Sequence, residues 1–138
     1  MASIVDRTRP GGAHFFHAAV LAGMLALFLC ALLADYAYWA SYQIQWSNFA
    51  SWLLVGAMVL ASLAVICEII ALVGGGRSVV HILVLAATWV LGFFDALHHG
   101  RDAWAIMPTA LVLSVLAVVL AFVATWIGFA SLRAGGAR

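Results

Sequence analysis

The 138-residue chain is too apolar to fold as a water-soluble domain, because 67% of its residues are hydrophobic and 8% are charged, against about 25% charged residues in soluble domains. Its formal net charge is only +1, and its six basic residues, all of them Arg, are scattered along the sequence, which excludes a nucleic-acid-binding surface. Membrane-spanning helices of about 20 residues each, with their connections, would use the whole length and leave no room for a soluble catalytic domain.

Apolar segments in chain order predict four transmembrane helices. The first, residues 14–40, follows an Arg-containing head, but its apolar run is longer than a signal-peptide core, so we expect a retained helix. The second spans about 49–73, the third 79–97 and the fourth 107–132. The short links make neighbouring helices antiparallel. The predicted fold class is therefore all-α, an integral membrane up-down four-helix bundle forming one domain, 1–138.

The arginines predict the orientation of this bundle in the lipid bilayer. Five of them lie on the side of the two termini, and only Arg101 lies on the other side. Because positively charged residues are retained in the cytoplasm, we expect a multi-pass protein of the bacterial inner membrane with both termini cytoplasmic. The outer ends carry an aromatic belt, formed by Trp39, Tyr42, Trp46, Trp52 and Trp104.

The two cysteines fall inside apolar segments, where we expect buried thiols. On the helix directions above, Cys30 and Cys67 differ in depth by about 20 Å at 1.5 Å per residue. A disulfide needs Cα atoms within about 7 Å of each other. We therefore expect both thiols to stay unlinked.

Ionisable residues inside the first segment share one helix face. His17 and Asp35 are 18 positions apart, which is five helical turns, and His14 lies about 60° away from them. An ionisable side chain in a spanning helix costs at least about 3 kcal/mol, so such residues tend to face the bundle interior and to mark function. The first helix is thus predicted to carry a polar stripe toward the core.

The third segment carries a matching stripe of His81, Thr88, Asp95 and His99, within about 40° of one another. The first and third helices run parallel across the core, so residues at equal depth can meet. We expect an inner layer near the termini and an outer layer near the opposite face. The inner layer contains His14, His17, Glu68 and His81, and the outer layer contains Asp35, Asp95, His98 and His99, with Arg101 and Asp102 at its rim.

Three interpretations of the inner layer stay open. Two His on opposite helices, His81 with either His17 or His14, are typical of a bis-His b-type haem site. His17 and His81 together with Glu68 would also suit a divalent transition metal. Alternatively, these groups only cap helix starts or contact lipid headgroups.

The outer layer has two interpretations as well. Asp35 and Asp95 can pair with His98, His99 or Arg101, which lowers the cost of burying them. In the functional interpretation, the layer serves as a proton relay or a quinone contact. In the structural interpretation, it is a set of ion pairs that only stabilises the fold. We interpret the small residues of the fourth helix, Ser114 among them, as close-packing positions.

Several motifs resemble one bacterial family. His14 and His17 stand three residues apart before an apolar helix that ends near Asp35, His81 opens the third segment, and the stretch 108–114 leads to 125–128. Over nearly the whole chain this pattern resembles the four-helix membrane proteins catalogued as domain of unknown function 2231. The family motif has a Pro after each His, and often a third His. This chain has Phe15, Ala18 and Ala22 at those positions.

The resemblance implies an electron-transfer role, because relatives are sometimes fused to, or encoded with, quinoprotein sugar dehydrogenases. The leading hypothesis is a small haem b-binding membrane subunit that passes electrons between a partner dehydrogenase, in the membrane or periplasm, and quinone. The alternatives are a cofactor-free scaffold or assembly subunit, and a metal or proton conduit. No nucleophile–base pair, phosphate loop or hydrolase motif is present, so we do not expect a stand-alone enzyme; the oligomeric state stays open.

Overall fold

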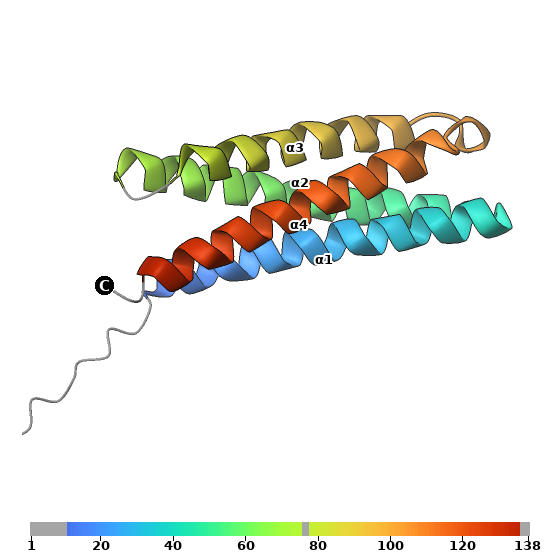
Figure 1. Ribbon diagram of the computed structural model, residues 1–138. Helices are drawn as coiled ribbons and strands as arrows, with labels where there is room; N and C mark the ends of the chain where they lie inside the picture. The colour runs from blue at the N-terminus through green and yellow to red at the C-terminus, as the bar shows by residue number, and fades with distance from the viewer. Residues whose placement is uncertain (1–10, 76–77, 136–138) are drawn as a thin grey trace, which may run out of the picture.

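The computed structural model describes residues 11–75 and 78–135, and it confirms the all-α four-helix bundle (Figure 1). All four long helices have the length and apolar composition needed to cross a membrane. A 3-10 turn lies in the connection between the third and fourth helices. The elements are α1 Gly12–Ser41, α2 Ile44–Val73, α3 Val79–His99, η1 Ala103–Ala105 and α4 Thr109–Gly135.

Two helix starts differ from the sequence prediction. Helix α2 begins at Ile44 rather than near residue 49, because a helix continues through the polar residues Gln45, Ser47 and Asn48, which interrupt the apolar pattern without breaking the backbone geometry. Helix α4 begins at Thr109 rather than at 107. The apolar pattern therefore marks the membrane-embedded part of each helix and not its ends.

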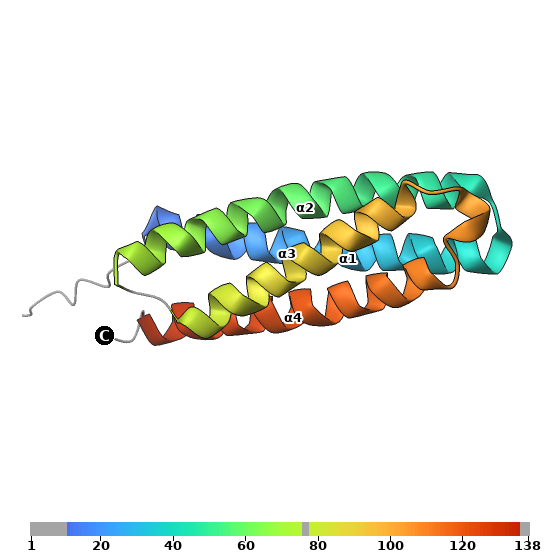
Figure 2. The same cartoon turned by 90° about the horizontal axis from the view of Figure 1, so that it is seen from above.

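The helices occupy the four corners of an antiparallel bundle. Helix α1 packs against α2 and α4, and α3 packs against the same two, so α1 and α3 lie diagonally across the core (Figures 1 and 2). The start of α1 and the end of α4 lie at one end of the bundle, together with the end of α2 and the start of α3 (Figure 1). The α3–α4 connection lies at the other end. This arrangement places the two polar stripes predicted for α1 and α3 across the core from each other.

Large side chains of the diagonal helices fill the space between rows of alanine. Leu21, Met24 and Phe28 of α1 and Leu85 of α3 are almost fully buried. Helices α2 and α4 present small residues to them at helical spacing, which lets the backbones approach closely. These buried alanines are Ala50, Ala57, Ala61 and Ala64 of α2 and Ala110, Ala117, Ala121 and Ala124 of α4.

Both cysteines are free, which confirms the expected absence of a disulfide. The expectation that both thiols are buried is wrong, because Cys30 is exposed on the outside of α1 and Cys67 is only half-buried. Large apolar side chains share that outer surface, among them Phe15, Val73 and Trp126. In a membrane, this surface faces lipid, so Cys30 is an apolar residue of the lipid-facing side.

Gly128 allows the close approach of α4 to the core, and we predict that Gly128→Ala destabilises the protein. A Cβ at this position would overlap Leu21 Cδ1 and lie 3.2 Å from His81 Cε1. Overpacking of this kind costs about 1–3 kcal/mol, so the midpoint of thermal unfolding in detergent should fall. Gly12→Ala is the control, because a Cβ there meets nothing within 4 Å. Equal midpoints for the two variants would contradict this packing.

The orientation in the membrane stays a prediction, which fusion reporters test. Five arginines on the side of the termini against one on the other side predict that a reporter fused after Arg138 reads as cytoplasmic. A reporter inserted after Arg101 should read as periplasmic, because the α3–α4 connection lies at the opposite end of the bundle (Figure 1). The reverse pair of signals would invert the assigned sides.

Candidate functional site

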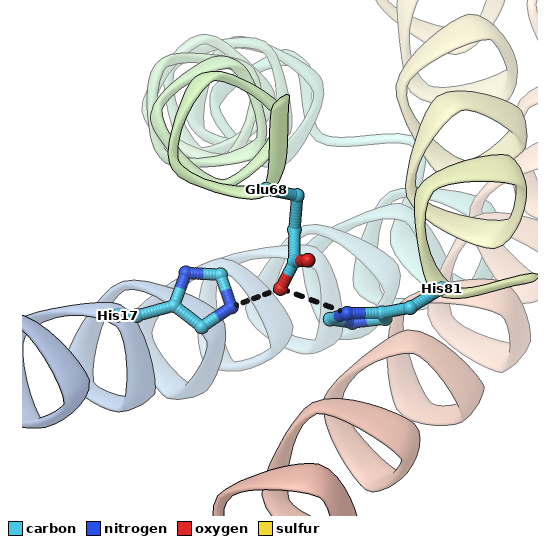
Figure 3. A group of neighbouring side chains, drawn as sticks. All are labelled: His17, Glu68 and His81. Atoms are coloured by element: carbon cyan, nitrogen blue, oxygen red, sulfur yellow. Dashed lines mark ion pairs between the residues drawn. The ribbon is translucent and has the colours of Figure 1, made fainter. Parts of the chain in front are cut away.

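Three ionisable side chains meet inside the bundle near its terminal end. His17 of α1, Glu68 of α2 and His81 of α3 point toward one another (Figure 3). Glu68 Oε1 lies 2.8 Å from His17 Nε2 and 2.9 Å from His81 Nδ1. All three side chains are buried, with at most 3% of the residue surface exposed. We call this group the His–Glu cluster.

Helix direction explains why the three residues share one depth. His17 follows the start of α1 at Gly12 by five residues, and Glu68 precedes the end of α2 at Val73 by five residues. His81 stands in the first turn of α3. Because α2 runs opposite to α1 and α3, its last turns lie beside their first turns. Three of the four residues predicted for the inner layer are thus brought together.

His14, the fourth predicted member, is exposed and does not join the cluster. It lies in the first turn of α1, three residues before His17, and three residues rotate a helical side chain by about 60° from alignment. That rotation carries His14 out of the interior. His14 therefore lies outside the group that contains His17.

The contacts of His81 require a proton or a metal ion between its ring and Glu68. His81 Nε2 is 2.9 Å from the backbone oxygen of Ala124, and a carbonyl oxygen only accepts, so Nε2 carries a hydrogen. The other ring nitrogen, Nδ1, faces the carboxyl oxygen of Glu68 at 2.9 Å. An unprotonated Nδ1 and an ionised carboxylate would be two acceptors facing each other. Either a shared proton or a metal ion removes that conflict.

The same contacts bear on the predicted haem. The rings of His17 and His81 are on opposite helices with centroids 6.1 Å apart and an interplanar angle of 88°. A bis-His haem needs its iron and the porphyrin plane between the two coordinating nitrogens. The Glu68 carboxylate lies between them, hydrogen-bonding distance from each (Figure 3). In this arrangement the Glu68 carboxylate occupies the space between the two rings that a porphyrin would need, and the haem stays a prediction.

A second polar group, which we call the aspartate cluster, lies toward the other end of the bundle. It consists of Asp35 of α1, Asp95 and His99 of α3, and Ser114 of α4, all buried. His99 Nε2 is 2.7 Å from Asp35 Oδ1, and His99 Nδ1 is 2.9 Å from the backbone oxygen of Asp95. Ser114 Oγ is hydrogen-bonded to Asp35 Oδ2 and lies 3.0 Å from Asp95 Oδ2.

Only part of the predicted outer layer belongs to this cluster. His99 is the partner of Asp35, as one of the alternatives predicted. His98 points away from the aspartate cluster, and its Nε2 lies 3.0 Å from the backbone oxygen of Ile106. Arg101 is exposed in the α3–α4 connection. Adjacent residues of a helix point in directions about 100° apart, so His98 and His99 cannot both face the core.

Ser114 was missed, because it stands in a row of small residues that was interpreted as close packing. The row contains Ala110, Ala117, Ala121 and Ala124, all buried, and Ser114 is buried in the same way. Two signals could have identified it: it carries a hydroxyl in an otherwise alanine row, and it lies one to two turns from the start of α4 at Thr109. That depth is also the depth of Asp95, near the end of α3.

The two clusters are separate sites. His17 and Asp35 are 18 residues apart on α1, or about 27 Å at 1.5 Å per residue. Leu21, Met24 and Phe28 lie between them, almost fully buried in the apolar core. The structure therefore shows two polar sites with a packed apolar layer between them.

Comparison with known proteins gives one match. The family model described as "Predicted membrane protein (DUF2231)" matches residues 13–133. No match was found among curated proteins or among solved structures. Because the matched range includes nearly all of the four helices and both polar clusters, the chain belongs to this family of predicted membrane proteins.

Proposed function

We propose that the chain is a membrane protein that binds one divalent transition-metal ion at the His–Glu cluster. The observation that carries this proposal is the convergence of three ligand atoms from three different helices. One atom each from His17, Glu68 and His81 lies within 4.8 Å of the other two, and all three residues are buried. Such convergence in an apolar bundle is costly unless a cation holds the groups together.

The donor chemistry selects the class of metal. Two imidazole nitrogens and one carboxylate oxygen form a donor set of catalytic zinc sites, in which a fourth position remains for water or substrate. Imidazole also suits iron, nickel and copper, whereas magnesium and calcium prefer oxygen ligands. The cluster thus favours a first-row transition metal over the hard alkaline-earth ions.

The surroundings of His81 support the same assignment. A metal-bound histidine usually donates its second ring N–H to a carbonyl or carboxylate, which fixes the tautomer and the ring orientation. His81 Nε2 donates in this way to the backbone oxygen of Ala124, 2.9 Å away. Its Nδ1 is thereby directed at Glu68, and the metal would take the place of the proton shared there. Protons compete with the metal for this site, so affinity should weaken in acid.

The electron-transfer hypothesis, with haem b, a partner dehydrogenase and quinone, requires a different arrangement of the same residues. The spacing of 6.1 Å between the ring centroids of His17 and His81 supports it, but Glu68 would have to leave the space between the rings. The scaffold hypothesis needs only the ion pairs themselves. Metal and haem titrations separate the three.

We predict that the purified protein, stripped with a chelator in detergent, binds one Co²⁺ ion per chain, with visible absorption bands that Zn²⁺ abolishes by displacement. Removing a group that is only hydrogen-bonded to a metal ligand typically lowers metal affinity ~10–100-fold. His17→Ala and His81→Ala should each lower Co²⁺ affinity by more than that, because each removes a ligand itself. Glu68→Gln should also weaken it, since the variant keeps the size of the side chain and loses its charge. Thermal unfolding of each variant reports whether it is folded.

His14→Ala and His98→Ala are the matched controls, because both histidines lie outside the His–Glu cluster. Their Co²⁺ affinity should equal that of the unaltered protein. Equal Co²⁺ binding by folded His81→Ala and unaltered protein would refute the metal site. Haem absorption bands that appear on haem titration and disappear in His81→Ala would support the electron-transfer hypothesis instead. If the protein binds neither Co²⁺ nor haem, the scaffold hypothesis remains.

A further inference from the structure

The hydroxyl of Ser114 lies between two carboxyl groups and has only one hydrogen to donate. Its Oγ is hydrogen-bonded to Asp35 Oδ2 and lies 3.0 Å from Asp95 Oδ2. If both carboxyl groups were ionised, one of these contacts would join two acceptors. One of the two carboxyl groups must therefore carry a proton.

The contacts of His99 identify which carboxyl group that is. His99 Nδ1 faces the backbone oxygen of Asp95, which only accepts, so Nδ1 carries a hydrogen. His99 Nε2 and Asp35 Oδ1, 2.7 Å apart, share a second hydrogen, so this contact is satisfied without the proton that the Ser114 contacts require. Asp95 Oδ1, 3.3 Å from His99 Nδ1, accepts no hydrogen bond from the described residues. The proton therefore belongs to Asp95.

The charge balance agrees with this count of protons. With His99 positive, Asp35 negative and Asp95 neutral, the buried cluster has no net charge. An ionised Asp95 would leave one uncompensated negative charge in the membrane interior, which is unfavourable. Helices α2 and α4 cannot compensate it, since neither has an Asp, Glu, His, Lys or Arg between residues 44 and 67 or between 109 and 132. The remaining nearby groups are engaged elsewhere or exposed: Tyr38 donates to Ala103 O, His98 contacts Ile106 O, and Arg101 and Asp102 lie in the α3–α4 connection.

We propose that the aspartate cluster is a proton-binding relay, in which Asp95 holds a proton at neutral pH and exchanges it with Asp35 through Ser114. In the transfer, the Asp95 Oδ2–H bond breaks and its hydrogen forms a covalent bond with Ser114 Oγ. At the same time the Ser114 O–H bond breaks, and that hydrogen forms a covalent bond with Asp35 Oδ2. One proton moves and no electron does. His99, the last residue of α3, is the member nearest the α3–α4 connection, and its side chain is buried, with 1% of its surface exposed. The relay shares no residue with the proposed metal site, so either can fail alone.

Infrared spectroscopy of the full chain in detergent at neutral pH tests this assignment. The unaltered protein should show the carbonyl stretch of an un-ionised carboxylic acid, shifted in D₂O, and Asp95→Asn should abolish it. Ser114→Ala should shift the band, because the acid loses its acceptor, and should slow the exchange of its proton for deuterium. Glu68→Gln separates any acid band of the His–Glu cluster from that of Asp95.

Thr125→Ala is the matched control for Ser114→Ala. Thr125 is a buried hydroxyl of the same helix whose Oγ1 donates to Leu21 O, away from the aspartate cluster, so its loss should leave the Asp95 band and its exchange rate unchanged. Absence of an acid band from the unaltered protein, or its persistence in Asp95→Asn, would overturn the proton assignment. If Asp95→Asn does not fold, an unshifted acid band in Ser114→Ala would overturn the proton assignment instead. A shifted band with an unchanged exchange rate would overturn the relay.

Discussion

Neutralisation of buried charge is the constraint on which this bundle depends. Each buried carboxyl group sits where water cannot solvate it, and an unpaired charge at membrane depth costs at least about 3 kcal/mol. Glu68 of α2 therefore requires the histidines of α1 and α3, and Asp35 of α1 requires His99 of α3 and Ser114 of α4. These contacts join the diagonal helices at both ends of the bundle. The alanine rows of α2 and α4 let those helices come close enough for the contacts to form.

Spacing along the sequence was sufficient to predict most of both clusters. The sequence predicts that His17 and Asp35 share one helix face, and that His81, Asp95 and His99 share another, because helical rotation is fixed by residue number. It also predicts that His17 and His81 share one depth and Asp35 and Asp95 another, because helical rise is fixed in the same way. Spacing does not predict whether a serine hydroxyl donates to a backbone oxygen of its own helix or to a side chain of another helix. Ser62, for example, donates to Met58 O of its own turn, whereas Ser114 crosses to two other helices, although both are serines in apolar helices.

The expectation of haem shows a related limit. Pairing histidines on opposite helices identifies which two rings can face each other, but a third side chain entering from a neighbouring helix decides what fits between them. The position of Glu68 in α2 predicts that it lies in the same layer as the histidines. That its side chain points toward both rings follows only from the packing of the four helices. That orientation places the carboxylate between the two imidazoles and brings three possible ligand atoms together.

The two clusters differ in chemistry as well as in place, and this difference bears on the conduit hypothesis. The His–Glu cluster contains two histidines and one carboxyl group, whereas the aspartate cluster contains one histidine, two carboxyl groups and a hydroxyl. Between them, the core of the described residues is closed by Leu21, Phe28 and Leu85, which pack with the alanine rows. The two buried hydroxyls of this layer, those of Thr88 and Thr125, donate to the backbone oxygens of Val84 and Leu21. An ion crossing from one cluster to the other would have to separate these apolar side chains, so a conduit along the core would require this packed layer to open.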